Sequence, residues 1–265
     1  MKQNKNRRKN IFAAVVTILL LFSAGGGLFA QSASEISKKS ADIIDFVSME
    51  MDLTIIIRDA RGSERVRQLT MSSGLFNGVN KTLIRFMAPS DVKGTALLIY
   101  DYQDKEDDMW IYMPALKKVR RIISSERGKS FMGSEFTNAD MSKPNHIDFN
   151  YTLIGSATYE GKECWVVEAE GKDQNIKRSN GYSKSISYIE KDTYLCYKTE
   201  YYNMAGDLHR IRITSDYKNV TKSSYFAYST TMENVKNGRI SEMKVNKMDT
   251  GKNFREDMFS PNALQ

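Results

Sequence analysis

Histidine and cysteine are scarce in this sequence, which contains two of each among its 265 residues. Neither His146 nor His209 has a second histidine or a cysteine at metal-ligand spacing, so we expect no metal site and no cofactor. A G-x-S-x-G elbow and a P-loop are absent, and Ser134, in the sequence MGSE, lacks the partner base of a nucleophile. These absences disfavour an enzyme, although a site assembled from distant residues stays an alternative.

Proline is also rare, with four residues, and the sequence has neither a low-complexity run nor an internal repeat. A linker between domains is therefore not expected. With 41% apolar and 11% aromatic residues, the chain can fill one sizeable hydrophobic core. We predict a single domain over residues 31–265, preceded by a separate segment at residues 1–30.

Acidic residues are missing from the first 30 positions, which carry five basic residues. The whole chain has a formal charge of +7, but residues 31–265 contain 34 basic and 32 acidic side chains, a net charge of +2. A nearly neutral domain does not favour nucleic acid as a partner.

The N-terminal segment has the order of a secretory signal peptide. A basic stretch precedes the apolar run Ile11 to Phe22, three glycines break that run, and Leu28-Phe29-Ala30 precedes Gln31. The run is shorter than the ~20 residues that a membrane-spanning helix needs, so an uncleaved anchor is the less favoured alternative. We predict export and cleavage after Ala30.

Cys164 and Cys196 are the two cysteines, and an even count in an exported protein suggests a disulfide. However, one predicted strand lies between the two strands that carry these cysteines, and strands two apart in a sheet are separated by about 9.5 Å. That separation exceeds the usual reach of a disulfide unless the sheet bends. The sequence therefore leaves open whether the two cysteines form a disulfide or are free thiols.

Alternation of apolar and polar residues dominates the chain after one predicted helix, Ser34 to Val47. It begins in the segment Met49 to Arg58 and continues to Met248, with turn signals such as Asn77-Gly78 and Asn237-Gly238. The pattern predicts a mainly β (α+β) protein with about eleven strands, in one curved antiparallel sheet that forms an incompletely closed barrel. The polar stretch Ser124 to Ile147 is the longest irregular segment.

The segment Met109 to Ile123, MWIYMPALKKVRRII, combines an apolar strand with a basic turn. Trp110 and Tyr112 fall on one side of the strand, and Pro114 ends it. At helical spacing the following apolar residues share one face and the cations share another. The four cations are Lys117, Lys118, Arg120 and Arg121. They form either a solvated face or a surface that meets anionic headgroups or an acidic partner.

Five strings follow one another along the chain: FMAPSDVKGTALLIYDY (Phe86 to Tyr102), the segment beginning at Met109, SFMGSEFTNADM (Ser130 to Met141), YYNMAGDLHRI (Tyr201 to Ile211) and MFSPNAL (Met258 to Leu264). In this order they resemble the LolA-like "outer membrane lipoprotein-sorting protein" family. The resemblance implies a half-open β-barrel with helices filling its mouth. It also implies a carrier of lipid or lipoprotein acyl chains in the periplasm of a two-membrane bacterium.

From the residues and the resemblance together we expect a binding protein that moves acyl chains between envelope membranes without catalysis. It would contact the membrane transiently, and an inner-membrane transporter could load it. Alternatives are an accessory module of an envelope transporter that binds a protein segment, and a lipid hydrolase. The expected lipid-binding side chains are apolar residues of strands and of the long loop: Leu53, Ile55, Ile57, Leu97, Ile99, Trp110, Tyr112, Phe131 and Phe136. The four cations are the expected site for headgroups or the partner.

Overall fold

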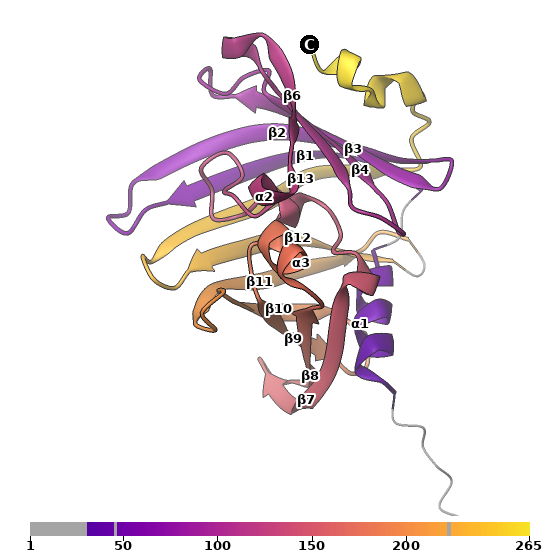
Figure 1. Cartoon of the computed structure of the whole chain (residues 1–265), viewed down its shortest axis with the longest axis vertical. Coiled ribbons are helices and arrows are strands. Elements are labelled where there is room, and N and C mark those ends of the chain that lie inside the picture. The colour runs from indigo at the N-terminus through magenta and orange to yellow at the C-terminus, as the bar shows by residue number, and fades with distance from the viewer. Residues whose placement is uncertain (1–30, 45–46, 222–223) are drawn as a thin grey trace, which may run out of the picture. The chain divides into compact units, whose positions relative to one another are not determined.

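One antiparallel sheet organises the computed structural model, which describes residues 31–44, 47–221 and 224–265. Its 13 strands lie in the order β6-β5-β4-β3-β2-β1-β13-β12-β11-β10-β9-β8-β7. The sheet is open, because its edge strands β6 and β7 do not pair with each other (Figure 1). The predicted fold class is confirmed, with 13 strands in place of about eleven.

The strands are β1 (Ser48–Arg58), β2 (Glu64–Phe76), β3 (Val79–Ala88), β4 (Ala96–Asp101), β5 (Asp108–Met113), β6 (Lys118–Ile122), β7 (Phe149–Tyr159), β8 (Lys162–Gly171), β9 (Lys184–Glu190), β10 (Cys196–Tyr202), β11 (Leu208–Asn219), β12 (Tyr225–Asn234) and β13 (Arg239–Thr250). The helices are α1 (Ala33–Asp42), α2 (Ser124–Arg127) and α3 (Gln174–Asn180). Short 3₁₀ turns include Ala139–Met141, His146–Asp148, Glu256–Phe259 and Pro261–Leu264. Every helix in the described part of the chain is too short or too polar to cross a lipid bilayer.

Alternation along β1 decides which face of the sheet is buried. Met51, Leu53, Ile55 and Ile57 are each at most 2% exposed and point to one side, which we call the inner face. The neighbouring strands continue that face, since Leu53 pairs with Leu69 of β2 and residues paired across a ladder point the same way. The inner face therefore holds the main core.

The irregular segment 130–141 fills one half of the inner face. Phe131 and Phe136 are 1% and 3% exposed and pack in the main core. The ring of Phe131 lies 5.6 Å from that of Phe86 on β3. The loop aromatics are thus structural anchors over the strands β1 to β5.

The opposite, outer face of β3 to β6 is covered by the C-terminal turns. Phe259 and Leu264 are fully buried against Ala96 and Leu98. The Tyr100 hydroxyl donates to the carbonyl of Phe259 at 2.6 Å. Because β4 is covered on both sides, it needs the apolar residues on both faces that its sequence shows.

The basic turn after Pro114 is a strand, so the predicted helical geometry is wrong. Residues 118–122 form β6 and pair with β5, with Ile122 opposite Met109. Alternation at period two then separates the cations: Arg120 pairs with Glu126 at 2.6 Å, and Arg121 with Asp108. Lys117 and Lys118 have no ion-pair partner among the described residues.

The two cysteines are free thiols in the structure, so the disulfide is not formed. Cys164 of β8 pairs with Glu190, whereas Cys196 of β10 pairs with Ile189. Glu190 and Ile189 are consecutive residues of the intervening strand β9, so their side chains and those of their partners point to opposite faces. A full strand and a change of face separate the two sulfur atoms.

Candidate functional site

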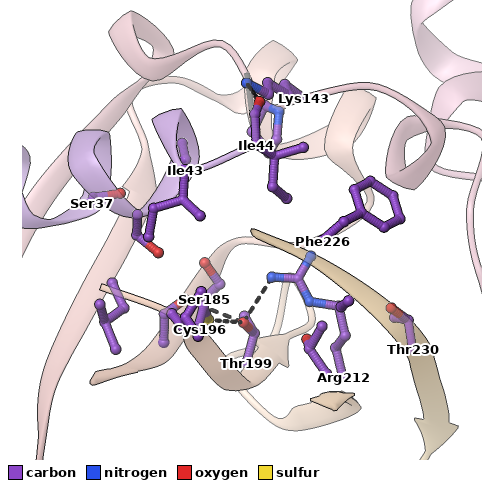
Figure 2. Close-up of a pocket in the computed structure, with 18 of the residues that line it drawn as sticks. Ser37, Ile43, Ile44, Lys143, Ser185, Cys196, Thr199, Arg212, Phe226 and Thr230 are labelled. Atoms are coloured by element: carbon purple, nitrogen blue, oxygen red, sulfur yellow. Dashed lines mark hydrogen bonds between the residues drawn. The ribbon is translucent and has the colours of Figure 1, made fainter. Parts of the chain in front are cut away.

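A cavity of about 410 Å³ occupies the other half of the inner face. It lies between the sheet on one side and α1 with residues 142–146 on the other (Figure 2). Segment 130–141 fills the first half and leaves this second half hollow. The volume lies within the 300–1,000 Å³ that is usual for small-molecule pockets.

One wall of the cavity is apolar and comes from the central strands β1, β2 and β13. Its side chains are Met49, Met51, Leu53, Met71, Met243 and Val245. The register explains why they meet: Met51 pairs with Met71, and Leu53 with Val245. Unbranched methionines fill irregular spaces and adapt to different apolar ligands.

The other wall is polar and comes from β9 to β12. Hydroxyl groups line it: Ser185, Ser187, Thr199, Tyr201, Thr214, Tyr217 and Thr230. Ser187 pairs with Thr199, and Thr214 with Thr230, so these side chains share the inner face. Sequence reasoning missed this wall, because strands with alternating hydroxyls are typical of a solvated face.

Arg212 of β11 is the charged residue of the polar wall. It pairs with Thr199 across the β10–β11 ladder, and its Nη2 donates to the Thr199 hydroxyl at 3.0 Å. Burial favours the neutral form, but neighbouring Tyr201 and Cys196 favour the charged form, and the pKa of Arg212 lies above its ordinary value. The guanidinium is therefore cationic at neutral pH.

Helix α1 closes the cavity from the side opposite the sheet. A capping box at Ser32 begins it, and Ile36 is fully buried. Its Ser34 hydroxyl lies 2.9 Å from Nε2 of His146, whose ring stacks on Tyr151 at 4.4 Å. Burial lowers the pKa of His146, so the imidazole is neutral at pH 7 and links α1 to the 3₁₀ turn at residues 146–148.

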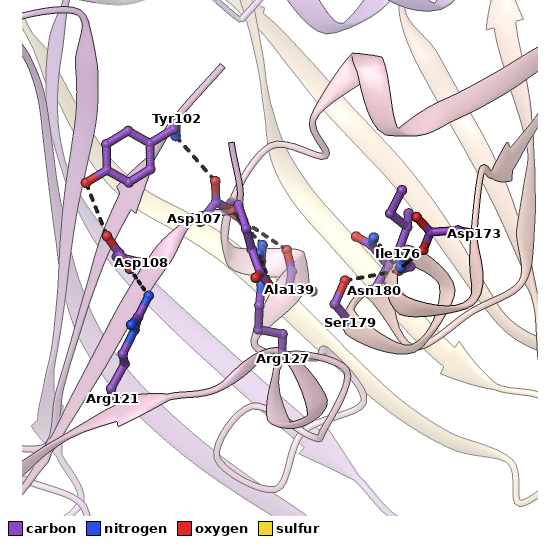
Figure 3. Close-up of polar contacts among 12 residues, drawn as sticks. Tyr102, Asp107, Asp108, Arg121, Arg127, Ala139, Asp173, Ile176, Ser179 and Asn180 are labelled. Atoms are coloured by element: carbon purple, nitrogen blue, oxygen red, sulfur yellow. Dashed lines mark hydrogen bonds and ion pairs between the residues drawn. The ribbon is translucent and has the colours of Figure 1, made fainter. Parts of the chain in front are cut away.

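A second hollow of about 490 Å³ lies between α2, α3 and residues 104–107, and it is polar. Asp107 accepts from Arg127 at 2.7 Å (Figure 3). It also accepts from Ser142 at 2.9 Å. Burial, with the Asp107 charge nearby, raises the pKa of Asp101 to about 6. Because Asp107 and Arg127 form an ion pair, this region is best explained as a structural ion-pair cluster.

The described lining of the cavity contains one histidine, His146, and one cysteine, Cys196, and no aspartate or glutamate. The described residues contain no group of three or more His, Cys, Asp or Glu side chains that could hold a metal ion. Ser34 and His146 are the nearest approach to a nucleophile and base. In the described chain no carboxylate is hydrogen-bonded to His146, so this pair lacks the third member that orients a triad.

Of the nine predicted lipid-binding residues, Leu53 lines the cavity. Six others belong to the adjoining packed core and not to the lining: Ile55, Ile57, Leu97, Ile99, Phe131 and Phe136. The placement of Trp110 and Tyr112 in the cavity is wrong. Both lie on the outer face, in the cluster with Phe259 and Leu264, because the inner face of β5 is taken by Met109 and Ile111. The four basic residues lie at the β6 edge and outside the cavity.

Solved structures with the same fold cover nearly the whole described chain. The crystal structure of a "putative outer membrane lipoprotein-sorting protein domain" from Vibrio parahaemolyticus is 27% identical, with a TM-score of 0.81, and the match covers 88% of this chain and 97% of that one. A DUF1329 family protein from Desulfovibrio piger is 23% identical, with a TM-score of 0.81 and coverage of 88% and 98%. A LolA superfamily protein from Nitrosomonas europaea is 19% identical, with a TM-score of 0.70 and coverage of 88% and 100%.

A family model described as "Uncharacterized protein" matches residues 78–265. None of the curated proteins that were compared matches the sequence. The predicted resemblance is confirmed by the solved structures, and the family match covers more than half of the chain. The chain therefore belongs to the family of that model, and it has a LolA-like fold.

Proposed function

We propose that the protein is a periplasmic carrier that binds acyl chains in the cavity under α1 and moves them between envelope membranes. The observation that supports this most directly is the 410 Å³ cavity with a wall of methionine and aliphatic side chains. The proposed place of action depends also on the signal peptide expected at residues 1–30, which lie outside the described residues.

The energetics of acyl transfer explain why a cell needs such a cavity. An acyl chain loses ~0.8 kcal/mol of hydrophobic stabilisation for each CH₂ group that enters water. A 16-carbon chain thus faces a barrier on the order of 12 kcal/mol between two membranes. A dry cavity removes most of that barrier, and release needs no covalent step.

Filling the cavity tests the carrier function. Ala169 of β8 lines the cavity, so Ala169→Phe places a ring in the space that the acyl chain would occupy. We expect affinity for a fluorescent fatty-acid probe to fall by about tenfold or more, with little change in melting temperature, because the ring enters a hollow and does not overpack a core. Probe titration and thermal unfolding measure the two effects.

The matched control is Ala157→Phe on the neighbouring strand β7, outside the cavity. It adds the same ring and should leave probe binding unchanged. Equal binding by wild type and Ala169→Phe would show that the cavity does not hold the acyl chain. Lipid extraction from protein purified out of its native envelope then identifies the cargo.

We propose further that Lys117 and Lys118 promote transient contact with anionic lipid. A charge near a lipid surface contributes about 1 kcal/mol, so Lys117→Gln/Lys118→Gln should weaken association with anionic vesicles by roughly 30-fold. The salt dependence of the association should decrease in parallel. Sedimentation with vesicles at several salt concentrations measures both.

Arg120→Gln/Arg121→Gln is the control with the same net charge. These arginines already pair with Glu126 and Asp108, so their loss should weaken association less. Both double variants should melt like wild type, since exposed ion pairs contribute at most ~1 kcal/mol. If the two variants lose association equally, total charge and not the two lysines determines membrane contact.

A further inference from the structure

The charges that line the cavity have one sign. Among the described lining residues, Lys143 and Arg212 are charged, and none is an aspartate or a glutamate. Lys143 lies at the α1 side and donates from Nζ to the carbonyl of Ile44 at 2.8 Å. Lys143 is exposed and Arg212 lies inside, so the cavity presents positive charge without a described lining carboxylate to balance it.

Arg212 lacks the ion pair that its neighbour Arg210 has. Arg210 donates from Nη1 to Asp140 at 2.6 Å and to the carbonyl of Glu135 at 3.1 Å. No described carboxylate lies within ion-pair distance of Arg212. Among carboxylates, Asp140 raises the pKa of Arg212 most, after Tyr201 and Cys196, and it is already paired with Arg210.

The donors of Arg212 are also incompletely used. A guanidinium has five N–H donors. In the described chain Arg212 makes one hydrogen bond, from Nη2 to Thr199, and its Nε is buried without a partner. Figure 2 shows the guanidinium rising from the strand toward the space below Ile44 and Phe226. Buried charges are normally paired, so an unpaired arginine facing a cavity indicates a missing anion.

We propose that the cargo is an anionic amphiphile whose carboxylate or phosphate binds Arg212, while its acyl chain lies along the methionine wall. This inference rests on the proposed carrier function and specifies its ligand class. Arginine suits the role because its planar fork matches the two oxygens of a carboxylate or phosphate. An acyl chain joined to a protein through an amide or ester bond has no anionic group of this kind, so the cavity favours a free lipid over a lipoprotein.

The hydroxyl groups around Arg212 fit the same ligand. Thr199 positions the guanidinium, and Ser185, Thr214 and Thr230 present further hydroxyls on the polar wall. A hydroxyl can donate to an oxyanion, whereas a second carboxylate in the wall would repel it. The apolar wall lies across the same cavity, so head and tail are recognised by different strands of one sheet.

Three probes test the proposal on the full mature chain: a fluorescent fatty acid, its neutral methyl ester, and a lysophosphatidate. Wild type should bind at least one of the two anions more tightly than the ester. Tighter binding of the fatty acid would indicate a carboxylate cargo, and tighter binding of the lysophosphatidate would indicate a phosphate cargo. Arg212→Met should weaken binding of that anion by about 10- to 100-fold and leave the ester unchanged. Arg212→Lys keeps the positive charge but loses the planar guanidinium. Its affinity for that anion should lie between those of wild type and Arg212→Met.

Thermal unfolding controls for folding, and Arg61→Met, an exposed change in the β1–β2 turn, is the matched variant that should bind like wild type. Equal affinity of wild type for the acid, the lysophosphatidate and the ester, with no selective loss in Arg212→Met, overturns anion recognition and leaves the carrier function standing. Absence of binding to all three probes overturns both. A selective loss of anion binding in a variant that melts like wild type establishes the proposal.

Discussion

Leu97→Glu is expected to prevent folding and not merely to block ligand binding. Leu97 lies on the interior strand β4, is 1% exposed, and packs in the main core beside Ile84 and Ile111. The substitution removes a buried aliphatic side chain and leaves a carboxylate among apolar neighbours, with no cation to pair it. A loss of about 5 kcal/mol or more follows, which is comparable with the whole stability of a typical domain.

Circular dichroism and thermal unfolding measure the effect, and two variants define its cause. Leu97→Met conserves volume and should cost less than about 1.5 kcal/mol. Val66→Glu places the same carboxylate on β2 at a side chain that is 47% exposed, and should lie within about 0.5 kcal/mol of wild type. A folded Leu97→Glu variant with a wild-type melting temperature would contradict the packing described for β4.

The sequence predicts which side chains of a strand point inward only where the other face of that strand is polar. On β1 the polar residues Asp52 and Thr54 flank Leu53, so alternation predicted the inner face correctly. On β5 both sets of side chains are apolar, because the C-terminal turns cover the outer face. Alternation therefore separated Trp110 from Met109 but could not tell which of them points inward.

The sequence of β11 is misleading in the opposite way. Arg210 and Arg212 alternate with Ile211 and Ile213, a pattern that normally places the isoleucines inside. The structure places the arginines on the inner face, since Arg212 pairs with Thr199 and lines the cavity. Local periodicity could not predict this, because the anionic partner of Arg210 comes from a segment 70 residues away.

That long-range contact also joins two of the strings that carry the resemblance. The string Ser130 to Met141 contains Asp140, the string Tyr201 to Ile211 contains Arg210, and the two residues form an ion pair. Glu135 in the first string donates its backbone N–H to Ser241 at 2.9 Å and accepts from Asn234 at 3.0 Å. The string Ser130 to Met141 therefore attaches the loop to β11, β12 and β13 and does not line the cavity, whereas Tyr201 of the other string does line it.

Asp140→Ala is accordingly expected to destabilise the protein strongly. Arg210 is 2% exposed, its Nη1 bonds Asp140 at 2.6 Å, and its guanidinium lies 4.9 Å above the ring of Tyr201. Removing the carboxylate leaves a buried charge without its counterion, which costs about 3–5 kcal/mol. For a domain of this size the melting temperature should fall on the order of 10 °C. Asp257→Ala breaks the exposed Arg255–Asp257 pair and should change it little.

The double variant Asp140→Leu/Arg210→Met tests whether the lost stability comes from the unpaired charge of Arg210 or from the missing shape of the acid. Replacing both members of a buried pair by apolar residues of similar volume is often neutral or stabilising, so this variant should regain most of the lost stability. It would also retain the cavity, because Arg210 does not line it. If the double variant melts as early as Asp140→Ala, the loop is held by the shape of the acid and not by its charge. Since the loop closes one half of the inner face, recovery with normal probe binding would show that the ion pair serves folding and not ligand binding.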